Sequence, residues 1–410
     1  MRIAIIGTGI SGLSAAWLLH PHHDLTLFEA GDHVGGHTRT VPVAKNGTAQ
    51  AVDTGFIVFN RKTYPTFCAL IDRLGVAAQP TEMSFAVRCD RSGIEYLGTN
   101  INGLFAQRRN LLSPSFHKLW LDILRFNKLT KTLLTAGPEL TVGELLDREG
   151  FSTRFVELYL APITASIWSM PVADLRRFPA RFMARFLENH GMNSVDDRPQ
   201  WYTITGGSWT YVKALIKPFA ERIRLSMPVQ RIVRHADHVE ITSALGTEIF
   251  DQVIIAAHSD QALALLADPS VAEREVLGAI PYHRNRVVLH TDIGHMPRLK
   301  KVWAAWNYRV PAGTDSAPQV TYWMNRLQHL SGEQQYLVTL NPSEAIPGAL
   351  RTIDDTHPHF TTAAPAAQAR WAEVNGVNRT WFAGAWWGFG FHEDGCASGV
   401  RVAAGLGARL

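Results

Sequence analysis

A short apolar run near the start of the chain predicts a strand that is buried on both faces. Residues 2–6 (RIAII) show no polar alternation, which is typical of a central strand in a parallel sheet. A glycine-rich turn follows at 7–12, and residues 13–20 have the character of a helix. A second apolar run at 25–28 repeats the strand pattern. The order of strand, glycine turn, helix and strand predicts a Rossmann-like βαβ unit.

The glycine turn has the spacing of a dinucleotide-binding motif. Gly7 permits the tight turn, Gly9 lets a pyrophosphate approach the backbone, and Gly12 lets helix and strand pack closely. The helix start would offer free N–H groups and a positive dipole end to the phosphates. Glu29, at the end of the second strand, would accept hydrogen bonds from the adenosine ribose and repel a 2′-phosphate. The pattern therefore fits FAD or NAD and does not fit NADP.

The segment that follows favours FAD over NAD. Gly35 and Gly36 place two further glycines beside the expected pyrophosphate. A hairpin is predicted over 40–43 and 49–52, turned by Asn46-Gly47, and it ends in 53–55 (DTG). An NAD dehydrogenase has no need of this loop, whereas a long cofactor whose ring lies far from its adenine does.

Charge and cysteine content limit the remaining classes of function. The chain carries 40 basic and 36 acidic residues, a net charge of +4, which is too small and scattered for a nucleic-acid surface but compatible with an anionic membrane. Cys68, Cys89 and Cys396 form no CxxC pair. We therefore expect no disulfide framework and no metal site, and a reducing, cytoplasmic location.

Four later segments complete a resemblance that covers the chain. Residues 227–232 (MPVQRI), 251–257 (DQVIIAA), 381–384 (WFAG) and 388–399 (GFGFHEDGCASG), together with the N-terminal motif, resemble the flavin-containing amine oxidoreductase superfamily. The resemblance implies non-covalent FAD. The cofactor-binding residues predicted from it and from the motif are Gly7, Gly9, Ile10, Ser11, Gly12, Glu29, Ala30, Gly35, Gly36, His37, Thr38, Asp53, Thr54, Gly55, Val229, Ala256, Gly384, Ala385, Phe391, Glu393, Asp394 and Gly395.

A narrower resemblance suggests the substrate. Residues 54–65 (TGFIVFNRKTYP), 163–168 (ITASIW), 321–325 (TYWMN) and 388–395 (GFGFHEDG) resemble a subgroup of predicted FAD-binding proteins. That subgroup includes the N-terminal flavin domain of plant cyclopropane fatty acid synthases and bacterial fatty-acyl desaturase-like flavoproteins. It implies an apolar acyl chain, within a phospholipid, as substrate, and a cyclopropane-synthase-like methyltransferase as a partner.

Two positions depart from the superfamily pattern. His37 stands where an arginine usually contacts the pyrophosphate. Residues 282–292 (YHRNRVVLHTD) lack the lysine that amine oxidases place near the flavin ring, and they offer Arg284, Arg286 and His290 as polar alternatives. The missing lysine weakens an amine-oxidase interpretation more than it weakens the flavin interpretation.

The positions of these segments imply an interleaved fold. We expect an α/β protein in which a Rossmann-like FAD-binding domain alternates with an α+β substrate domain. Strands are predicted at 286–290, 319–324 and 336–340, and an irregular connection at 342–365. The FAD-binding domain would comprise 1–79, 216–270 and 371–410, and the substrate domain 80–215 and 271–370.

One amphipathic stretch, residues 116–128, allows two interpretations. Its apolar positions 116, 119, 120 and 123 share one helical face, and Arg108, Arg109, Lys118, Arg125, Lys128 and Lys131 surround it. The helix either packs into its own domain, which we favour, or lies on an anionic bilayer at the inner face of the membrane.

The C-terminal motif supplies the candidate catalytic residues. His392 or Glu393 is predicted to take a proton during dehydrogenation. Alternatively these residues fix the loop, with Asp394 as the cap of a helix that begins near Gly395. Four aromatic residues could wall the substrate site or simply pack in the core: Trp386, Trp387, Phe389 and Phe391.

Together these features predict an FAD-dependent oxidoreductase. The leading hypothesis is a dehydrogenase (desaturase), oxidase or isomerase that moves a hydride between an acyl chain and flavin N5. The alternatives are a flavin-dependent amine or amino-acid oxidase, and a non-catalytic flavoprotein that accompanies a lipid methyltransferase.

Overall fold

The first layer of the fold is a five-stranded parallel sheet. The computed structural model describes residues 1–45, 48–134, 139–168, 172–192, 199–313 and 319–410. The strand order is β10-β2-β1-β14-β20, and every neighbouring pair is parallel. The strands are β10 (Ile223–Arg224), β2 (Asp24–Phe28), β1 (Arg2–Ile6), β14 (Gln252–Ile255) and β20 (Thr380–Phe382). The predicted Rossmann-like sheet is therefore confirmed, and it draws strands from three separate parts of the chain.

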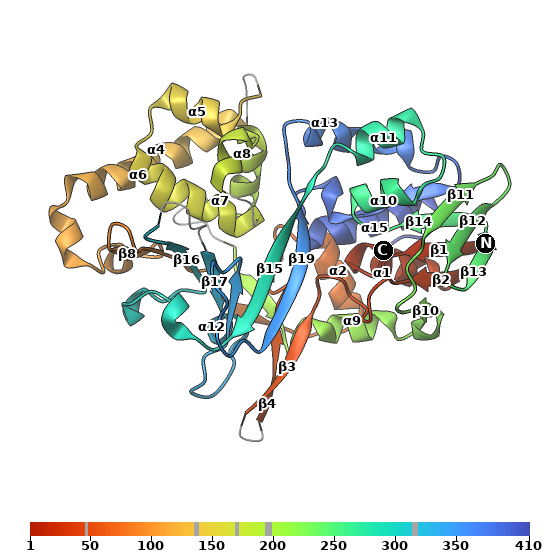
Figure 1. Cartoon of the computed structure of the whole chain (residues 1–410), viewed down its shortest axis with the longest axis horizontal. Coiled ribbons are helices and arrows are strands. Elements are labelled where there is room, and N and C mark those ends of the chain that lie inside the picture. Colours follow the sequence, from red (N-terminus) through yellow and green to blue (C-terminus); the bar gives the residue numbers. More distant parts are fainter. Residues whose placement is uncertain (46–47, 135–138, 169–171, 193–198, 314–318) are drawn as a thin grey trace.

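Helices from both ends of the chain cover this sheet (Figure 1). Helix α1 (Ile10–Leu19) packs along α15 (His392–Gly405). The two helices approach closely because a Cβ on Gly399 would lie 2.1 Å from the Ser11 carbonyl oxygen. Helix α1 begins three residues earlier than the sequence predicted. The other elements of this lobe are α2 (Pro65–Arg73), α9 (Trp209–Ile216), α10 (Ser259–Leu265), α11 (Val271–Leu277), α13 (Ala364–Ala369), α14 (Trp371–Val374), β11 (Arg231–Arg234), β12 (Val239–Ser243) and β13 (Gly246–Phe250).

A seven-stranded sheet, order β19-β15-β18-β17-β16-β7-β8, forms the second lobe. Neighbouring strands are antiparallel except for the parallel pair β16 and β7. Its strands are β7 (Phe85–Cys89), β8 (Ile94–Leu97), β15 (Tyr282–His290), β16 (Trp306–Val310), β17 (Gln319–Trp323), β18 (Leu337–Leu340) and β19 (Arg351–Pro358). The three predicted strands are present. The prediction of an irregular connection over 342–365 was wrong, because β19 pairs with β15 along its whole length.

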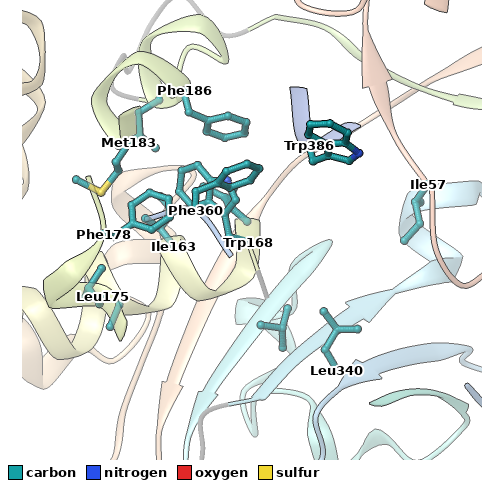
Figure 2. Close-up of a cluster of buried hydrophobic side chains, with 14 of the residues drawn as sticks. Ile57, Ile163, Trp168, Leu175, Phe178, Met183, Phe186, Leu340, Phe360 and Trp386 are labelled. Carbon is teal, nitrogen blue, oxygen red and sulfur yellow. The ribbon is translucent and has the colours of Figure 1, made fainter. Parts of the chain in front are cut away.

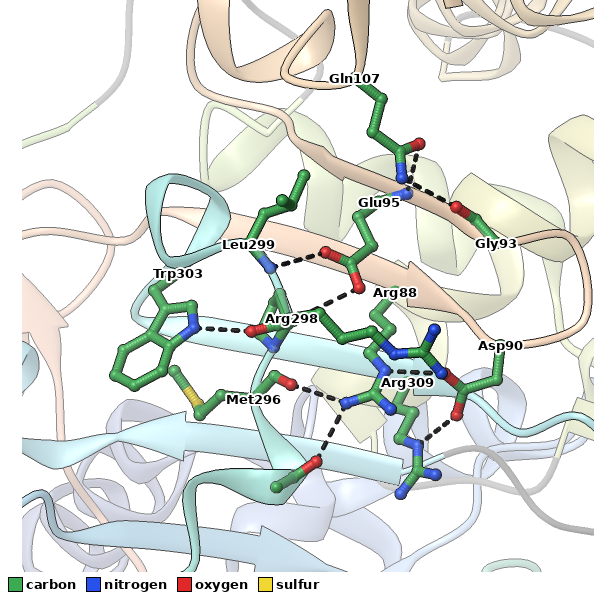
Figure 3. Close-up of polar contacts among 12 residues, drawn as sticks. Arg88, Asp90, Gly93, Glu95, Gln107, Met296, Arg298, Leu299, Trp303 and Arg309 are labelled. Atoms are coloured by element: carbon green, nitrogen blue, oxygen red, sulfur yellow. Dashed lines mark hydrogen bonds and ion pairs between the residues drawn. The ribbon is translucent and has the colours of Figure 1, made fainter. Parts of the chain in front are cut away.

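Buried ion pairs fix the far edge of this sheet (Figure 3). The Asp90 carboxylate accepts from Arg88 Nε at 2.7 Å and from Arg309 Nε at 2.6 Å. Glu95, which is 4% exposed, accepts from the backbone N–H groups of Arg298 and Leu299. Every buried charge in this group therefore has a partner, as burial requires, and the loop before β16 is held against β7 and β8.

Two smaller sheets and a group of helices join the lobes. The hairpin β3 (Thr40–Lys45) and β4 (Thr48–Asp53) is present as predicted, while its predicted turn, Asn46-Gly47, lies outside the described residues. Strands β5 (Phe59–Asn60), β9 (Trp201–Ile204) and β6 (Ala78–Thr81) form the other small sheet. The helical part contains α3 (Ile101–Leu104), η1 (Arg108–Leu112), α4 (Pro114–Leu133), α5 (Val142–Glu149), α6 (Thr153–Phe155), α7 (Ala161–Trp168) and α8 (Ala180–Asn189), and α12 (Met324–Gln328) lies beside β17.

Helix α4 buries its predicted apolar face. Phe116, Leu119 and Ile123 are each less than 5% exposed, and α4 packs against α8 and α6. The favoured interpretation of this stretch, packing within its own domain, therefore holds for that face. Among the described residues, no helix has both the length and the hydropathy that a bilayer crossing requires.

Candidate active site

Among the described residues, a large cavity of about 1020 Å³ runs between the two lobes. One end is lined by the loops that follow β1 and β2, and the other by aromatic and aliphatic side chains of the helices and the seven-stranded sheet. We call these parts the dinucleotide end and the apolar end. They meet near Phe391 and His392, where α15 begins.

The glycines at the dinucleotide end allow backbone segments to approach closely. Gly7 has φ +101°, and a Cβ at this position would lie 2.6 Å from the Ala256 carbonyl oxygen. A Cβ on Gly12 would lie 2.1 Å from the Gly7 carbonyl oxygen. Gly9 differs, since a Cβ there would meet no protein atom within 4 Å. Gly7 and Gly12 are therefore required by the fold, whereas Gly9 faces the open cavity.

The start of α1 is available to an anion. Gly9 precedes the helix, and no side chain caps it. Thr8, Ile10 and Ser11 line the cavity beside it. Unpaired N–H groups and the positive end of the helix dipole form a binding site for phosphate.

Glu29 lies at the carboxyl end of β2, as the sequence predicted. Its carboxylate accepts from the N–H groups of Thr8 at 2.9 Å and Gly31 at 2.8 Å. These bonds hold the carboxylate at the cavity wall. It is therefore placed to accept hydroxyl hydrogen bonds from a ribose.

A cluster of histidines lines the cavity around His37. The His37 ring lies 5.1 Å from His357 and 6.3 Å from His258, between centroids. Burial, and secondarily His37, lowers the pKa of His357 to about 3 and that of His258 to about 4. The His37 Nε2 atom is buried without a hydrogen-bond partner. Histidine and unpaired polar atoms at this position suit a phosphate group, which would supply the missing partner.

Arg39 and Asp355 join the same cluster, and the sequence did not indicate either. Arg39 donates to both carboxylate oxygens of Asp355 at 3.1–3.4 Å, which helps hold the pKa of that carboxyl below its usual value although burial opposes it. Asp355 comes from β19, the strand that the sequence did not predict. No local motif in β19 indicated a site, because its residues reach the cavity only through pairing with β15.

His392 is locked in place at the junction of the two ends. Its ring stacks on Phe56 at 3.7 Å, and its Nε2 shares a hydrogen bond of 2.8 Å with the Tyr211 hydroxyl. That hydroxyl in turn shares a 2.6 Å bond with Thr38 Oγ1. Burial lowers the pKa of His392 to about 3. The ring is therefore neutral at physiological pH and a weak base, and it lines the cavity.

Glu393 does not line the cavity, in contrast to its predicted role as a proton acceptor. Its two carboxylate oxygens accept from the N–H groups of Thr66 at 2.9 Å and Phe67 at 2.8 Å. These amides are at the first turn of α2, so the carboxylate caps that helix. The structure assigns Glu393 a positioning role, joining α15 to α2.

Asp394 and Asp53 also point their carboxylates into the protein. Asp394 accepts from the Phe391 N–H at 2.9 Å within a helix that begins at His392, so Phe391 is the N-cap instead of Asp394. Burial raises the pKa of Asp394 to about 7. Asp53 accepts from Thr40 and Ser208, and burial raises its pKa to about 6. Both residues hold the loops of the dinucleotide end from behind.

The predicted cofactor residues thus divide into two groups. Gly12, Thr38, Asp53, Glu393, Asp394 and Gly395 lie behind the wall. The residues that line the cavity are Gly7, Gly9, Ile10, Ser11, Glu29, Ala30, Gly35, Gly36, His37, Thr54, Gly55, Val229, Ala256, Gly384, Ala385 and Phe391.

The apolar end is walled by aromatic and aliphatic side chains (Figure 2). Trp168 and Ile163 come from α7, Phe186 from α8, and Phe360 from the segment after β19. Leu340 closes the side formed by β18. Of the four predicted aromatics of the C-terminal motif, Trp386, Phe389 and Phe391 line the cavity and Trp387 does not.

Strand β15 contributes no cation to this end. Arg284 and Arg286 are exposed, and His290 is buried beyond the cavity with its Nε2 bonded to Thr339 Oγ1. The β15 residues that line the cavity are Tyr282 and Val287. The polar alternatives that the sequence offered therefore do not reach the cavity.

The described residues fit FAD. A glycine-lined helix start, a carboxylate placed to accept from a ribose and a buried histidine nitrogen without a partner occur in the order that a dinucleotide requires, and the apolar end begins where its ring would lie. The three cysteines are buried and none lines the cavity. Helix α15, which begins three residues before its predicted start, has its N-terminal residues Phe391 and His392 at the wall.

Comparison with solved structures supports the same fold. Wild-type putrescine oxidase bound to putrescine is 14% identical with a TM-score of 0.72, covering 99% of both chains. A CLA-producing fatty acid isomerase from P. acnes is 17% identical with a TM-score of 0.70, again covering 99% of both chains. At these identities the likeness shows the fold alone.

Sequence comparison extends the result to the family. AofH of Mycobacterium tuberculosis, which carries the name of a flavin-containing monoamine oxidase, is 26% identical over 77% of this chain and 69% of its own length. Amine oxidase A of Canis lupus familiaris is 24% identical over 71% of this chain, which spans only 54% of that protein. The profile of the flavin containing amine oxidoreductases matches residues 10–406. The chain therefore belongs to the flavin-containing amine oxidoreductase family and is an FAD-dependent oxidoreductase.

Proposed function

We propose that this oxidoreductase acts on an apolar acyl chain, within a phospholipid, as a dehydrogenase, oxidase or isomerase. The observation that carries the proposal is the apolar end of the cavity. Trp168, Phe186 and Phe360 form the wall there, and this wall continues to Phe391 and His392. An extended hydrocarbon gains free energy from burial against such a wall without any charged partner.

The distribution of charge at the cavity favours an uncharged substrate. Among the described residues, the carboxylates that line it are Glu29, Asp354 and Asp355. Glu29 lies where the ribose is predicted to bind, Asp355 pairs with Arg39, and Asp354 contacts Arg286 near the surface. No carboxylate thus remains in the described part of the apolar end to hold an ammonium group.

His190 is the titratable imidazole of the apolar end. Its Nδ1–H donates to the Phe186 carbonyl at 2.9 Å, and burial lowers its pKa to about 4. It is therefore neutral at pH 7. A neutral ring stacked on Phe186 at 3.8 Å adds to the apolar character of the wall.

The chain's own residues would bind and orient the acyl chain and exclude water, and His392 would hold the Phe56 ring at the junction. FAD, when bound, supplies the acceptor for a hydride. In a dehydrogenase one carbon would give up a hydride to the bound FAD while the neighbouring carbon would lose a proton to the neutral His392 ring or to water, which would leave an alkene; O₂ or an electron carrier would then take up the two electrons. In an isomerase the same hydride returns to the chain, so no outside oxidant is consumed.

Two solved neighbours support different substrates. The fatty acid isomerase is named for an acyl substrate, which is the class proposed here. Putrescine oxidase is named for an amine, and the sequence relatives with amine oxidase names favour that class as the alternative. We prefer the acyl chain because no carboxylate in the described part of the apolar end could hold an ammonium group.

The test is an anaerobic titration of the purified holoprotein followed by flavin absorbance. We expect bacterial phospholipid to bleach the ~450 nm band and a panel of amines to leave it unchanged. Bleaching by amines alone would overturn the acyl proposal and support an amine oxidase. If neither class reduces the flavin and photoreduction also fails, the non-catalytic partner of a lipid methyltransferase becomes the better account. For a phospholipid substrate we propose a cytoplasmic location at the inner face of the membrane.

A further inference from the structure

The outer surface of the helical lobe carries apolar side chains that no part of the described chain covers. Ile101 is 75% exposed, Leu112 88% and Leu121 65%. Leu111 and Leu124 are each 48% exposed. Clusters of large exposed apolar side chains mark binding surfaces more often than chance. We call this set, on α3, η1 and the exposed face of α4, the apolar rim.

Hydrogen bonds show that the three elements of the apolar rim are neighbours. Arg108 of η1 donates to the Asn102 side chain of α3 at 3.1 Å. His117 of α4 shares a 2.8 Å bond with the carbonyl of Leu111. Leu121 and Leu124 follow His117 by one and two turns on the same side of the helix. The five exposed apolar side chains are therefore carried by three elements that are bonded to one another.

The surface is positively charged. Over residues 98–134 the only carboxylate is Asp122, which is 3% exposed. Six cations in this stretch are exposed: Arg108, Arg109, Lys118, Arg125, Lys128 and Lys131. Apolar side chains ringed by lysine and arginine fit the interface of an anionic bilayer, with the apolar groups below the headgroups and the cations among the phosphates.

The apolar rim also borders the mouth of the cavity. Ile101 and Leu124 are both exposed and line the cavity, together with the half-buried Trp120. On α4 the cavity side carries Ile123 and Asn127, while the opposite side carries Leu121 and Arg125. Leu124 lies between the two. An occupant of the rim is therefore next to the entrance, and α4 lies at the outer end of the molecule, away from β1 and β14 (Figure 1).

We infer that the apolar rim docks on an anionic phospholipid bilayer, so that an acyl chain passes from the membrane into the apolar end between Ile101 and Leu124. The inference rests on the proposed acyl substrate for its purpose, but docking is measured separately from turnover. Charge and hydrophobicity together distinguish this occupant from a second copy of the chain, since two copies would bring six cations against six.

The test is sedimentation of the holoprotein with vesicles of phosphatidylglycerol and phosphatidylethanolamine, compared with phosphatidylcholine vesicles. Leu112→Asp combined with Leu121→Asp should lower binding to the anionic vesicles at least about 30-fold. Neither residue lines the cavity. The matched control replaces Leu245 and Ile249, 67% and 52% exposed in the other lobe, by Asp and should bind as wild type.

A charge variant separates the electrostatic contribution. Lys128→Gln with Lys131→Gln should weaken binding about 20-fold at low salt and much less at about 0.5 M salt. Lys213→Gln on α9 combined with Lys217→Gln, directly after that helix, is the control. Wild-type protein that ignores anionic vesicles, or a rim variant that binds them as well as its control, overturns the inference. A wild-type dimer that the rim variant abolishes, with vesicle binding unchanged, also overturns it.

Turnover distinguishes this inference from the function beneath it. The Leu112→Asp, Leu121→Asp variant should reduce its flavin normally with a monomeric short-chain phospholipid and slowly with vesicles. Normal docking without flavin reduction by any lipid would contradict the acyl substrate and leave the docking surface in place.

Discussion

The two ends of the cavity are built in different ways. The dinucleotide end consists largely of backbone, from short segments after β1 and β2 in which Gly7 and Gly12 let chains meet. The apolar end consists of side chains, and residues such as Ile163, Phe186 and Leu340 reach it from distant parts of the chain. A site made of backbone depends on a few glycines and tolerates little change. A site made of side chains depends on total volume and tolerates exchange.

The largest expected effect comes from a single methyl group at the dinucleotide end. Gly12→Ala would place its Cβ 2.1 Å from the Gly7 carbonyl oxygen, so α1 must move away from β1. We expect a loss of about 3 kcal/mol in unfolding free energy and protein that purifies without flavin. Thermal denaturation and the ~450 nm absorbance measure the two effects.

Gly9→Ala is the matched control for this variant. A Cβ at Gly9 meets no protein atom within 4 Å, so the apoprotein should unfold at the wild-type temperature while FAD binds more weakly. A Gly12→Ala protein that is as stable and as yellow as wild type would contradict the account of the backbone site.

Acid should destabilise the protein through its buried histidines. Burial lowers the pKa of His190 to about 4, so between pH 4 and about 6.5 the unfolded chain binds a proton that the folded chain does not. The contribution of His190 to stability therefore falls as pH falls through this window and is constant above it. His190→Gln should reduce the slope of unfolding free energy by up to about 1.4 kcal/mol per pH unit.

Two buried carboxyl groups have the opposite effect on the pH dependence of stability. Asp53 and Asp394 have raised pKa values of about 6 and about 7. The stability that each contributes to the folded protein therefore falls as pH rises from about 4 to that raised pKa. More histidines than carboxyl groups are affected, so the net slope of unfolding free energy against pH should have the sign that the histidines give. The histidines with lowered pKa values are His190, His258, His290, His357 and His392. An unchanged slope in urea titrations of His190→Gln would show that folding does not lower the pKa of this imidazole.

Glu393→Gln tests whether the carboxylate at the junction positions or reacts. The substitution weakens the acceptor for the Thr66 and Phe67 N–H groups at the start of α2. We expect a loss of about 1–2 kcal/mol in stability and less than a threefold change in the rate of flavin reduction. Rapid-mixing absorbance gives the rate, and a Glu393→Asp variant should restore part of the stability. A large fall in rate at unchanged stability would return Glu393 to the mechanism.

The sequence predicted the dinucleotide end because its signals are local. One helix and one strand lie between the Gly7–Gly9 turn and Glu29, and the spacing of these residues alone implies their geometry. The hairpin was predicted from its Asn46-Gly47 turn, and of the strands of the second lobe β15, β17 and β18 were predicted from apolar runs. Glu393 was misplaced because a carboxylate near a flavin motif and a carboxylate that caps a neighbouring helix look the same in sequence.

Strand β19 shows what the sequence could not supply. Its residues are mostly polar (RTIDDTHP), and it forms a strand because β15 offers a free edge along eight residues. The site residues Asp355 and His357 come with it. Pairing between segments so far apart leaves no periodic trace in either one, so neither the strand nor its contribution to the cavity could be predicted.

The smallest expected effect is at the apolar end, where the comparison of the two ends predicts tolerance. Leu340→Met conserves volume at a residue that is 8% exposed and lines the cavity. Stability should change by less than about 1.5 kcal/mol, and flavin content should not change. The flexible methionine reshapes the wall, so the preferred acyl length should shift, seen as a change of several-fold in the apparent KM across a chain-length series.

Leu327→Met, fully buried on α12 and outside the cavity, should leave that preference unaltered. If both variants shift it equally, the change is transmitted through the core and Leu340 does not define the substrate wall; if Leu340→Met loses flavin, the two ends are not independent and the distinction between a backbone site and a side-chain site fails.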